Sequence, residues 1–237
     1  MLIGVLALQG DFQAHGRVLR GLGADVREVR TPAGLEGLDG IVIPGGESTT
    51  MTLGIEREGL AEPLRELVRS GTPVFGTCAG MIMLDRAHLG VMDIECRRNA
   101  FGRQIRSFEA DLRIPGVPGK PVRAVFIRAP WVERVGRDVE VLSTVSSGPA
   151  TGRIVAVRHD RLLATSFHPE MTGDARLHGY FAELVREQHL RRQPQDLCVA
   201  IAVRGRRCSR DSRCRCSRWR RGCSGSCRRR DRNGRCA

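Results

Sequence analysis

Cys78 lies in a run of small residues, Gly76-Thr77-Cys78-Ala79-Gly80, between a strand-like segment and an apolar segment that can form a helix. A strand that turns at once into a helix holds its turn residue in a sparsely populated backbone conformation, and bulky neighbours would clash with it. The pattern is typical of a nucleophile elbow with the thiol as the nucleophile. A cysteine that only packs in the core is the alternative, and a nucleophilic thiol also needs a base.

The candidate base is His168, in the segment "ATSFHPE" (164–170) at the end of the last strand-like run. Side chains alternate along an extended chain, so His168 and Glu170 are expected on the same side, with Pro169 stiffening the link. A carboxylate beside an imidazole selects its tautomer and stabilises its protonated form. A surface His-Pro-Glu turn is the alternative interpretation, because a short motif needs its structural context.

Alternating strands and helices are expected to position these residues. The first half of the chain has strand-like runs at 3–8, 24–29, 40–46 and 72–75, and helical runs at 11–22, at 60–69 and from residue 81. This alternation predicts an α/β fold, with a mostly parallel twisted sheet and helices on both faces. Ligands of such sheets bind beyond the carboxyl ends of the strands. The loops "IPGGES" (43–48) and "GTCAG" (76–80) both follow strand ends, so we expect them to share a crevice.

The second half of the chain is richer in strands. Strand-like runs lie at 122–130, 139–145, 153–160 and 162–170, and a helix with apolar residues at helical spacing is expected at 175–190. The sequence has no apolar run near 18 residues, which excludes a membrane-spanning helix. Its N-terminus reads as a buried strand and not as a signal peptide, so we expect a cytoplasmic protein without a membrane partner.

The formal net charge of +13 comes from one end of the chain. Residues 1–190 hold 23 basic and 23 acidic residues, whereas residues 191–237 hold 16 Arg, 3 Asp and seven of the nine cysteines. We therefore predict a folded domain at 1–190 and an Arg/Cys-rich tail at 191–237. The tail is expected to be disordered, because it combines dense like charge with few apolar residues.

Three explanations of the tail stay open. It could bind nucleic acid by neutralising phosphates. It could hold zinc, although its cysteines lack the repeated C-x₂-C spacing of a strong zinc site. It could be a frameshifted reading of a GC-rich gene, whose out-of-frame codons are rich in Arg, Gly, Ser and Cys. The composition favours the frameshift, and we expect no specific nucleic-acid partner.

Six blocks, in order along residues 1–189, are similar to those of a known family. They are "GVLALQGDFQAH" (4–15), "PGGESTTM" (44–51), "GTCAG" (76–80), "RNAFGRQ" (98–104), "FIRAP" (126–130) and "SFHPE" (166–170). With these blocks the chain resembles the class I glutamine amidotransferases and, more specifically, the glutaminase subunits of pyridoxal 5′-phosphate synthase. It departs from the family at Arg106, where an acidic residue is expected, and in the tail after residue 190.

The resemblance implies hydrolysis of L-glutamine to L-glutamate and ammonia. Cys78 would attack the side-chain amide carbon, His168 would transfer the proton and Glu170 would orient His168. The backbone N–H groups of Gly46 and Ala79 would stabilise the oxyanion. Residues implied to contact glutamine are Gly46, Glu47, Ser48, Arg98, Ile127 and Arg128, with Arg98 as the candidate for the α-carboxylate. From the residues alone, Glu47 could instead cap the following helix and Arg98 could be a solvated surface residue.

The resemblance also implies a partner, a (β/α)₈-barrel synthase subunit that receives the ammonia. The first block, with Gln9 and His15, would face this partner. Pyridoxal 5′-phosphate would be the product of the complex, and neither a cofactor nor a metal ion is expected for this chain. Two other functions stay open. One is a glutaminase for another synthase, such as imidazole glycerol phosphate synthase, which "PGGESTT" and "RNAFGRQ" argue against; the other is a non-catalytic nucleic-acid-binding protein, which only the tail supports.

Overall fold

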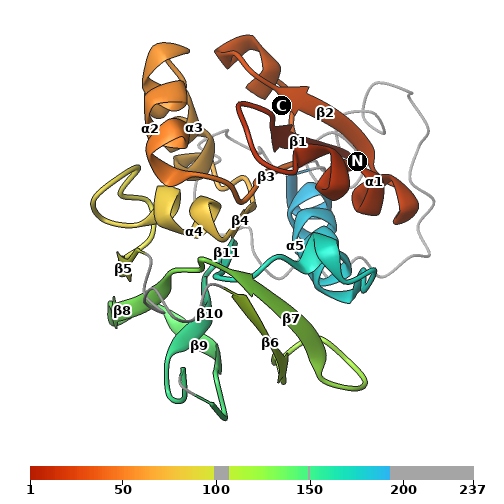
Figure 1. Cartoon of the computed structure of the whole chain (residues 1–237). Helices are drawn as coiled ribbons and strands as arrows, with labels where there is room; N and C mark the ends of the chain where they lie inside the picture. The colour runs from red at the N-terminus through yellow and green to blue at the C-terminus, as the bar shows by residue number, and fades with distance from the viewer. Residues whose placement is uncertain (99–106, 149, 193–237) are drawn as a thin grey trace, which may run out of the picture. The chain divides into compact units, whose positions relative to one another are not determined.

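The structure is a computed structural model that describes residues 1–98, 107–148 and 150–192 (Figure 1). Residues 191 and 192 end the last helix, and the rest of the predicted tail lies outside the described residues. Arg106 also lies outside them. The expectations for the tail and for Arg106 therefore stay predictions.

Parallel strands form the part of the sheet that carries the predicted loops. Their order is β2-β1-β3-β4-β11, and each neighbouring pair is parallel. The strands are β1 (Leu2–Leu6), β2 (Asp25–Val29), β3 (Gly40–Ile43), β4 (Val74–Thr77) and β11 (Leu162–Thr165). Ile43 of β3 pairs with Gly76 of β4, and Thr77 of β4 pairs with Thr165 of β11. These three strands thus end at the same edge, where the loops after them meet.

The sheet continues beyond β11 with antiparallel strands. They are β10 (Ile154–His159), β8 (Trp131–Val135) and β5 (Ile94–Arg97), and β9 (Glu140–Thr144) also pairs with β10. A separate antiparallel ribbon joins β6 (Ser107–Leu112) and β7 (Val122–Ile127). The predicted fold class is confirmed, as are the predicted strands β7, β9, β10 and β11. The sequence analysis does not predict β5, β6 or β8, whose short runs mix charged and apolar residues.

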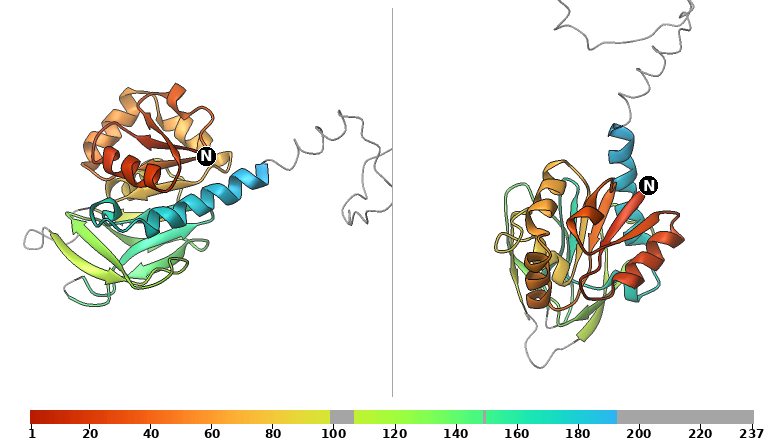
Figure 2. Two further views of the ribbon diagram at one scale, coloured as in Figure 1. Left: turned by 90° about the vertical axis from the view of Figure 1, so that its right-hand side faces the viewer. Right: turned by 90° about the horizontal axis from the view of Figure 1, so that it is seen from above.

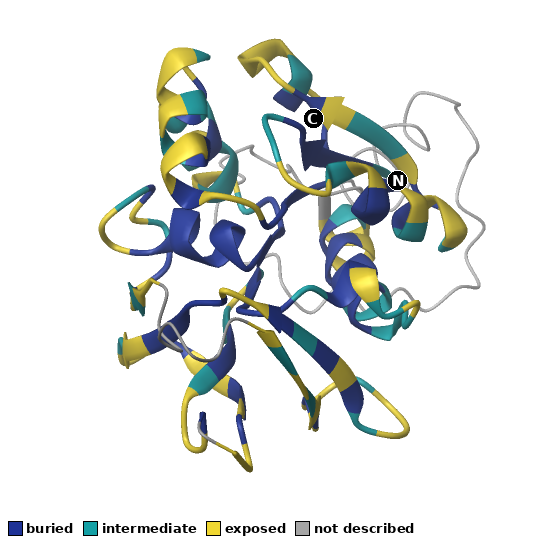
Figure 3. Cartoon of the chain, in the orientation of Figure 1, coloured by how far each residue is buried: buried dark blue, intermediate teal, exposed yellow. Residues whose placement is uncertain are grey.

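The parallel strands divide their side chains between two apolar cores, one on each face of the sheet. In β3, Ile41 and Ile43 pack in one core, whereas Val42 packs in the other. Val74 and Phe75 of β4 divide in the same way. Because successive side chains of a strand point to opposite faces, a sheet covered on both faces needs continuous apolar runs. Figure 3 shows β3, β4 and the following α4 as buried.

Helices cover both faces, as predicted. The first core contains residues of α2 (Ser48–Arg57), α3 (Ala61–Arg69) and α4 (Ala79–Leu84), and the second contains residues of α1 (Phe12–Gly21) and α5 (Arg176–Arg192). Figures 1 and 2 show α2 and α3 on one side of the parallel strands and α1 and α5 on the other. The predicted helices are confirmed with ends shifted by one or two residues. No helix in the described part of the chain has the length and apolar character needed to cross a membrane.

Candidate active site

Cys78 forms the turn between β4 and α4, and the predicted elbow is confirmed. Its φ of 51° and ψ of −109° are values that side-chain-bearing residues rarely adopt. Its backbone N–H donates to the carbonyl oxygen of Thr165 at 2.8 Å, which anchors the turn to β11. Small neighbours are required here. A Cβ at Gly80 would lie 1.9 Å from the carbonyl oxygen of Ile43, and one at Gly76 would lie 2.6 Å from the carbonyl oxygen of Gly80.

His168 and Glu170 lie together in the loop after β11. Nδ1 of His168 is 2.8 Å from Oε1 of Glu170, so the two side chains do lie on the same side. The backbone differs from the extended segment that the sequence predicts, because Pro169–Met171 forms a short 3₁₀ turn, η2. The backbone N–H of His168 donates to the carbonyl oxygen of Val125 at 2.9 Å, and β7 thereby holds the loop in place.

The charge of His168 depends on the groups at its two ring nitrogens. Burial acts to lower the pKa of His168, but hydrogen bonds with Cys78 and Glu170 and the charges of these groups outweigh burial and raise the pKa to about 10. Because Glu170 engages Nδ1, the ring atom left for Cys78 is Nε2. At neutral pH the arrangement therefore favours a protonated His168 between Cys78 and Glu170.

The Gly45–Gly46 loop after β3 lies against both Cys78 and His168. A Cβ at Gly45 would lie 2.4 Å from Cε1 of His168 and 3.1 Å from Cβ of Cys78, so only glycine leaves room for both side chains. Gly46 has a φ of 143°, in the region that favours glycine. The two loops that we expect to share a crevice therefore do meet.

Gln9, from the loop after β1, braces the start of α2. Its side-chain amide donates to the carbonyl oxygen of Glu47 at 2.8 Å and accepts the Glu47 N–H at 3.1 Å. A Cβ at Gly10 would lie 1.8 Å from the carbonyl oxygen of Gly45, so the two loops are in direct contact. The sequence analysis names Gln9 only as part of the block expected to face a partner, because nothing near it in the chain indicates a contact 38 residues away.

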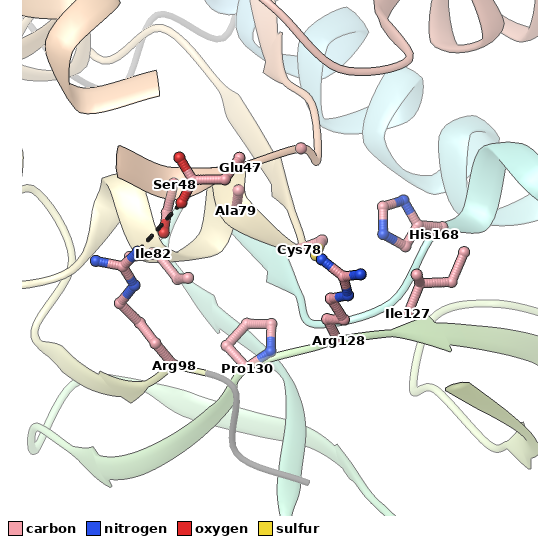
Figure 4. Close-up of a pocket in the computed structure, with 11 residues that line it drawn as sticks. Glu47, Ser48, Cys78, Ala79, Ile82, Arg98, Ile127, Arg128, Pro130 and His168 are labelled. Carbon is pink, nitrogen blue, oxygen red and sulfur yellow. Dashed lines mark hydrogen bonds and ion pairs between the residues drawn. The ribbon is translucent and has the colours of Figure 1, made fainter. Parts of the chain in front are cut away.

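A pocket of about 540 Å³ opens beside Cys78 and is lined by every predicted site residue except Glu170. Figure 4 shows Cys78 and His168 on one side of it, with Glu47 and Arg98 on the other. Glu170 is buried, with its carboxylate hydrogen-bonded to His168. The lining also includes Ile82 and Pro130, which are not predicted as site residues because their side chains carry no reactive or charged group. The full lining is Gly46, Glu47, Ser48, Cys78, Ala79, Ile82, Arg98, Ile127, Arg128, Pro130 and His168.

Glu47 lines the pocket and also caps α2, so both interpretations of this residue from the sequence hold for its position. Its carboxylate accepts the backbone N–H groups of Thr49 and Thr50 at 3.0 and 2.7 Å, and these bonds lower the pKa of Glu47 to about 2. Nη2 of Arg98 lies 3.3 Å from Oε1 of Glu47 and donates to Oγ1 of Thr49 at 2.9 Å. The Arg98 guanidinium is thus tied to the capping group, at the pocket, instead of extending freely into solvent.

The residues after β7 supply another part of the pocket lining. Ile127 is one of the exposed large apolar residues, with 38% of its surface accessible. Arg128 has a φ of 45°, which is rare for a residue with a side chain. Backbone strain of this kind clusters at ligand-binding and catalytic sites. Both residues lie where the sequence analysis places them, at the pocket.

Two buried histidines lie behind Glu170, of which the sequence analysis names only His15, and only as part of the block expected to face a partner. His15 of α1 and His178 of α5 have no exposed surface, and Nε2 of His15 lies 3.3 Å from Oε2 of Glu170. His15 therefore presents no exposed atom to a partner in this structure, and the expectation that its block faces one stays a prediction. One sequence signal was available, because His15 precedes Leu19 by four residues and so shares its apolar helix face.

The thiols of the described residues are not equivalent. Cys78 lies at the pocket, whereas Cys96 lies on β5, where burial raises the pKa of its thiol. A raised pKa disfavours the nucleophilic thiolate, so Cys96 is poorly suited to act as a nucleophile. The described ranges contain no group of three or more His, Cys, Asp or Glu side chains that could hold a metal ion.

Residues 5–187 match the sequence model of the SNO glutamine amidotransferase family. The chain belongs to this family. The match runs from β1 into α5 and includes Cys78, His168 and Glu170. The family resemblance inferred from the sequence blocks is therefore confirmed.

Two relatives named as pyridoxal 5′-phosphate synthase subunits match most of the chain. The pyridoxal 5′-phosphate synthase subunit PdxT of Salinispora tropica is 57% identical over 194 residues, which cover 78% of this chain and 96% of the relative. The PdxT subunit of Rhodococcus jostii is 56% identical over 196 residues, which cover 78% and 97% of the two chains. The chain thus spans nearly the full length of these relatives.

Solved structures agree with this family and fold. A crystal structure described as a glutamine amidotransferase is 45% identical, with a TM-score of 0.71, and the match covers 77% of this chain and 98% of that one. A structure of PurLQS from Thermotoga maritima is 18% identical with a TM-score of 0.57, over 80% and 97% of the two chains. The second likeness shows the fold alone.

Proposed function

We propose that this member of the SNO family hydrolyses L-glutamine to L-glutamate and ammonia, with Cys78, His168 and Glu170 as its catalytic triad. The observation that carries the proposal is an elbow cysteine and a His–Glu pair, with Nδ1 and Oε1 2.8 Å apart, at one pocket. The elbow presents the thiol, the imidazole holds the proton and the carboxylate orients the imidazole. These are the three parts that nucleophilic amide hydrolysis needs.

In the first half of the reaction, Sγ of Cys78 attacks the side-chain amide carbon of glutamine and the carbonyl oxygen becomes an oxyanion. The backbone N–H groups of Gly46 and Ala79 donate to this oxyanion. Ala79 is the first residue of α4, so its N–H has no acceptor within the helix. Removing one such donor typically raises the barrier by about 3 kcal/mol.

His168 then gives its proton to the amide nitrogen, the C–N bond breaks and ammonia leaves. Cys78 is left as a thioester with the glutamyl group. His168 takes a proton from water, whose oxygen attacks the thioester carbon, and the C–S bond breaks to release glutamate. Glu170 holds the imidazole in place and stabilises its protonated form in both halves of the reaction.

The pocket also carries charges that suit the α-carbon end of an amino acid. Arg98 is the proposed partner of the substrate α-carboxylate, because a guanidinium can donate two parallel hydrogen bonds to it. Glu47, 3.3 Å from Arg98, places a negative charge beside it that suits the α-ammonium group. Ser48, Ile127 and Arg128 are the proposed contacts for the rest of the substrate.

The ammonia is proposed to pass to a (β/α)₈-barrel synthase subunit that makes pyridoxal 5′-phosphate. The name of the similar subunits from Salinispora tropica and Rhodococcus jostii supports this assignment. Pyridoxal 5′-phosphate is then the product of the complex and not a cofactor of this chain.

The test measures glutamate release from glutamine by the full chain, with and without the synthase subunit, and pyridoxal 5′-phosphate formation by the complex. We expect glutamine to support both reactions. A complex containing Cys78→Ala should make pyridoxal 5′-phosphate from added ammonium but not from glutamine. Glutamine hydrolysis by Cys78→Ala at the wild-type rate would overturn the triad. If the chain co-purifies with a different synthase and does not support pyridoxal 5′-phosphate formation by the proposed one, the proposed partner is wrong.

A further inference from the structure

Polar side chains from three other elements converge behind Glu170. Nε2 of His15, on α1, lies 3.3 Å from Oε2 of Glu170 and 3.2 Å from Oγ1 of Thr77, on β4. Nδ1 of His15 lies 2.9 Å from Nε2 of His178, on α5. His15, Thr77 and His178 have no exposed surface, and the Glu170 side chain is 1% exposed. A continuous chain of buried polar groups therefore runs from His168 through Glu170 to α5.

Both histidines are neutral in this environment. Burial, followed by the charges of His178 and His168, holds the pKa of His15 well below its usual value. Burial also lowers the pKa of His178 to about 4. The two rings therefore act on Glu170 as oriented dipoles and not as positive charges.

The hydrogen bonds of the two rings favour one pair of tautomers. If His15 carries its proton on Nε2, this N–H lies between Oγ1 of Thr77 and the Glu170 carboxylate, and Nδ1 accepts from Nε2–H of His178. Nδ1 of His178, which has no hydrogen-bond partner among the described residues, is then a bare acceptor. The opposite tautomers would bury an unpaired N–H on His178 and turn a lone pair of His15 toward the carboxylate. A buried unpaired N–H is the rarer and more costly defect.

Nε2 of His15 lies close to two acceptors, Oε2 of Glu170 and Oγ1 of Thr77. At 3.3 Å, Nε2 of His15 is close to Oε2 of Glu170 without a well-aligned hydrogen bond, and Thr77 competes for the same N–H. A carboxylate buried this deeply needs donors on both oxygens to stay ionised. Among the described residues, the titratable groups that face it are His168 from its own loop and His15 from α1, with Cys78 and His178 one step further away.

We propose that His15, held in its Nε2–H tautomer by His178, is a positioning residue that keeps the Glu170 carboxylate ionised and turned toward His168. The proposal rests on the triad proposed above. His15 touches neither the pocket lining nor the reacting atoms, and it acts on His168 only through Glu170. A network of buried dipoles is suited to this, because polar groups in a low dielectric interact strongly and orient one another.

The main test compares His15→Leu, which removes the donor, with His15→Gln, whose side-chain amide keeps one. Glutaminase kcat, KM and the pH profile of kcat/KM are measured with the complex. We expect His15→Leu to lower kcat about 10-fold, because the N–H nearest to Oε2 of the charged Glu170 is lost, with KM changed less than twofold. The acidic limb should move to higher pH by about one unit, because Glu170 takes up a proton more readily without its donor. His15→Gln should restore most of kcat and the position of the limb.

A packing control separates this role from simple support of the fold. Leu19→Ala removes a fully buried side chain from the same face of α1 without touching the network. It should lower the unfolding free energy by about 2–5 kcal/mol and leave the acidic limb in place. An unshifted limb in His15→Leu, an equal shift in Leu19→Ala, or a His15→Gln variant no better than His15→Leu would overturn the proposal.

Two readouts do not depend on glutaminase activity. Nitrogen NMR of ¹⁵N-histidine-labelled wild-type protein should show His15 as the Nε2–H tautomer, and an Nδ1–H form would overturn the proposal even if His15→Leu fails to fold. The rate at which iodoacetamide alkylates Cys78 is followed by mass spectrometry of the peptide that contains it. The acidic limb of this alkylation rate, measured as a function of pH, should shift in His15→Leu by as much as the acidic limb of kcat/KM. If wild-type protein does not hydrolyse glutamine, the proposed function fails while these two readouts still test the network.

Discussion

At the scale of single residues, the proposed chemistry depends on the elbow that holds Cys78. The positive φ of Cys78 and the close approach of Gly80 to the carbonyl oxygen of Ile43 show that this turn tolerates little change. A thiol in such a turn has a fixed direction, so it is already oriented toward the base before the substrate binds. His168 then lies within hydrogen-bonding reach of both Cys78 and Glu170.

The first prediction compares the two described thiols. Cys78→Ala should abolish glutamine hydrolysis and leave the unfolding free energy nearly unchanged, because the nucleophile is lost and only one sulfur atom is removed. Cys96→Ala is the matched control, since Cys96 lies on β5, outside the pocket lining. It should keep wild-type kcat and KM. Steady-state kinetics and denaturant unfolding of both variants provide the measurement. Activity retained in Cys78→Ala, or lost in Cys96→Ala, would contradict the assignment.

The second prediction concerns recognition of the substrate carboxylate. Arg98→Gln should raise KM for glutamine about 10-fold with little change in kcat, because a contact made equally in the ground and transition states affects binding alone. Arg97→Gln is the neighbouring control. Its guanidinium lies over the Trp131 ring, 5.6 Å from the ring centroid, and outside the pocket lining. Equal effects of the two substitutions on KM would argue against a specific role of Arg98.

At the scale of elements, three strand ends and the loops after them build the site. β3 delivers the Gly45–Gly46 loop, β4 delivers Cys78 and β11 delivers His168, and the parallel register brings all three to one edge of the sheet. The β7 segment supplies the remaining wall and anchors the His168 backbone. The site therefore combines the parallel part of the sheet with an antiparallel ribbon.

The third prediction tests the fit of the loop after β3. Gly45→Ala should lower kcat strongly, by more than 10-fold, because the added Cβ would lie 2.4 Å from the His168 ring and force the base away from Cys78. Gly21→Ala, at the end of α1, meets no atom within 4 Å and should keep full activity, with stability equal or up to about 1 kcal/mol higher. Kinetics and thermal unfolding of both variants check this. A fully active Gly45→Ala would show that the loop can move aside.

Asp39 joins β1 to α5 and makes stability depend on pH. Burial acts to raise the pKa of Asp39, but hydrogen bonds from the Leu2 backbone N–H and from His189, each 2.8 Å long, outweigh it and lower the pKa. A lowered folded-state pKa means that the stabilisation is present above the unfolded value of 3.8 and is lost as the pH falls through the folded value.

The fourth prediction follows from that sign. Asp39→Asn should lower the unfolding free energy by about 1 kcal/mol at pH 7, and the difference from wild type should vanish as the pH falls below 3.8 toward the folded value. Urea unfolding at a series of pH values provides the measurement. Asp138→Asn, at an exposed turn, is the control and should track wild type at every pH. If the difference in unfolding free energy between Asp39→Asn and wild type grows as the pH falls, the proposed role of Asp39 is wrong.

At the scale of the whole molecule, most of the net positive charge lies outside the residues that the structure describes. The family match ends at residue 187, and the described structure ends with α5 at Arg192. The segment 193–237 carries 14 arginines and 3 aspartates, so most of the positive charge lies outside the part that builds the site. We propose that the domain of residues 1–190 is sufficient for glutamine hydrolysis.

The fifth prediction tests this division. A chain that ends at Arg192 keeps all of α5, including the contact of His189 with Asp39, and should retain wild-type kcat, KM and thermal stability. The full chain should also bind polyanions weakly, and a few hundred millimolar salt should abolish that binding, because dense arginine releases counterions non-specifically. Lost glutaminase activity on truncation, or salt-resistant and sequence-selective binding, would show instead that the tail is functional. Sequencing the gene through codons 185–200 tests the frameshift.

The sequence by itself was enough for the features that depend on neighbouring residues. The small residues around Cys78 predict the elbow, because a strand-to-helix turn excludes larger side chains locally. The alternation of strands and helices predicts the α/β class, because buried parallel strands and their covering helices have different periods. Six ordered blocks are sufficient to indicate the family, since their combination in this order is specific although any one block alone is weak.

Only the tertiary structure decided the contacts between distant segments. His15 and His178 are 163 positions apart, and no local pattern states that two helices on one face of a sheet will place their imidazoles behind Glu170. The same holds for Gln9 bracing Glu47, and for Arg98 pairing with the residue that caps α2. Periodicity shows which side of an element is buried, but the partner on that side depends on how the whole chain packs.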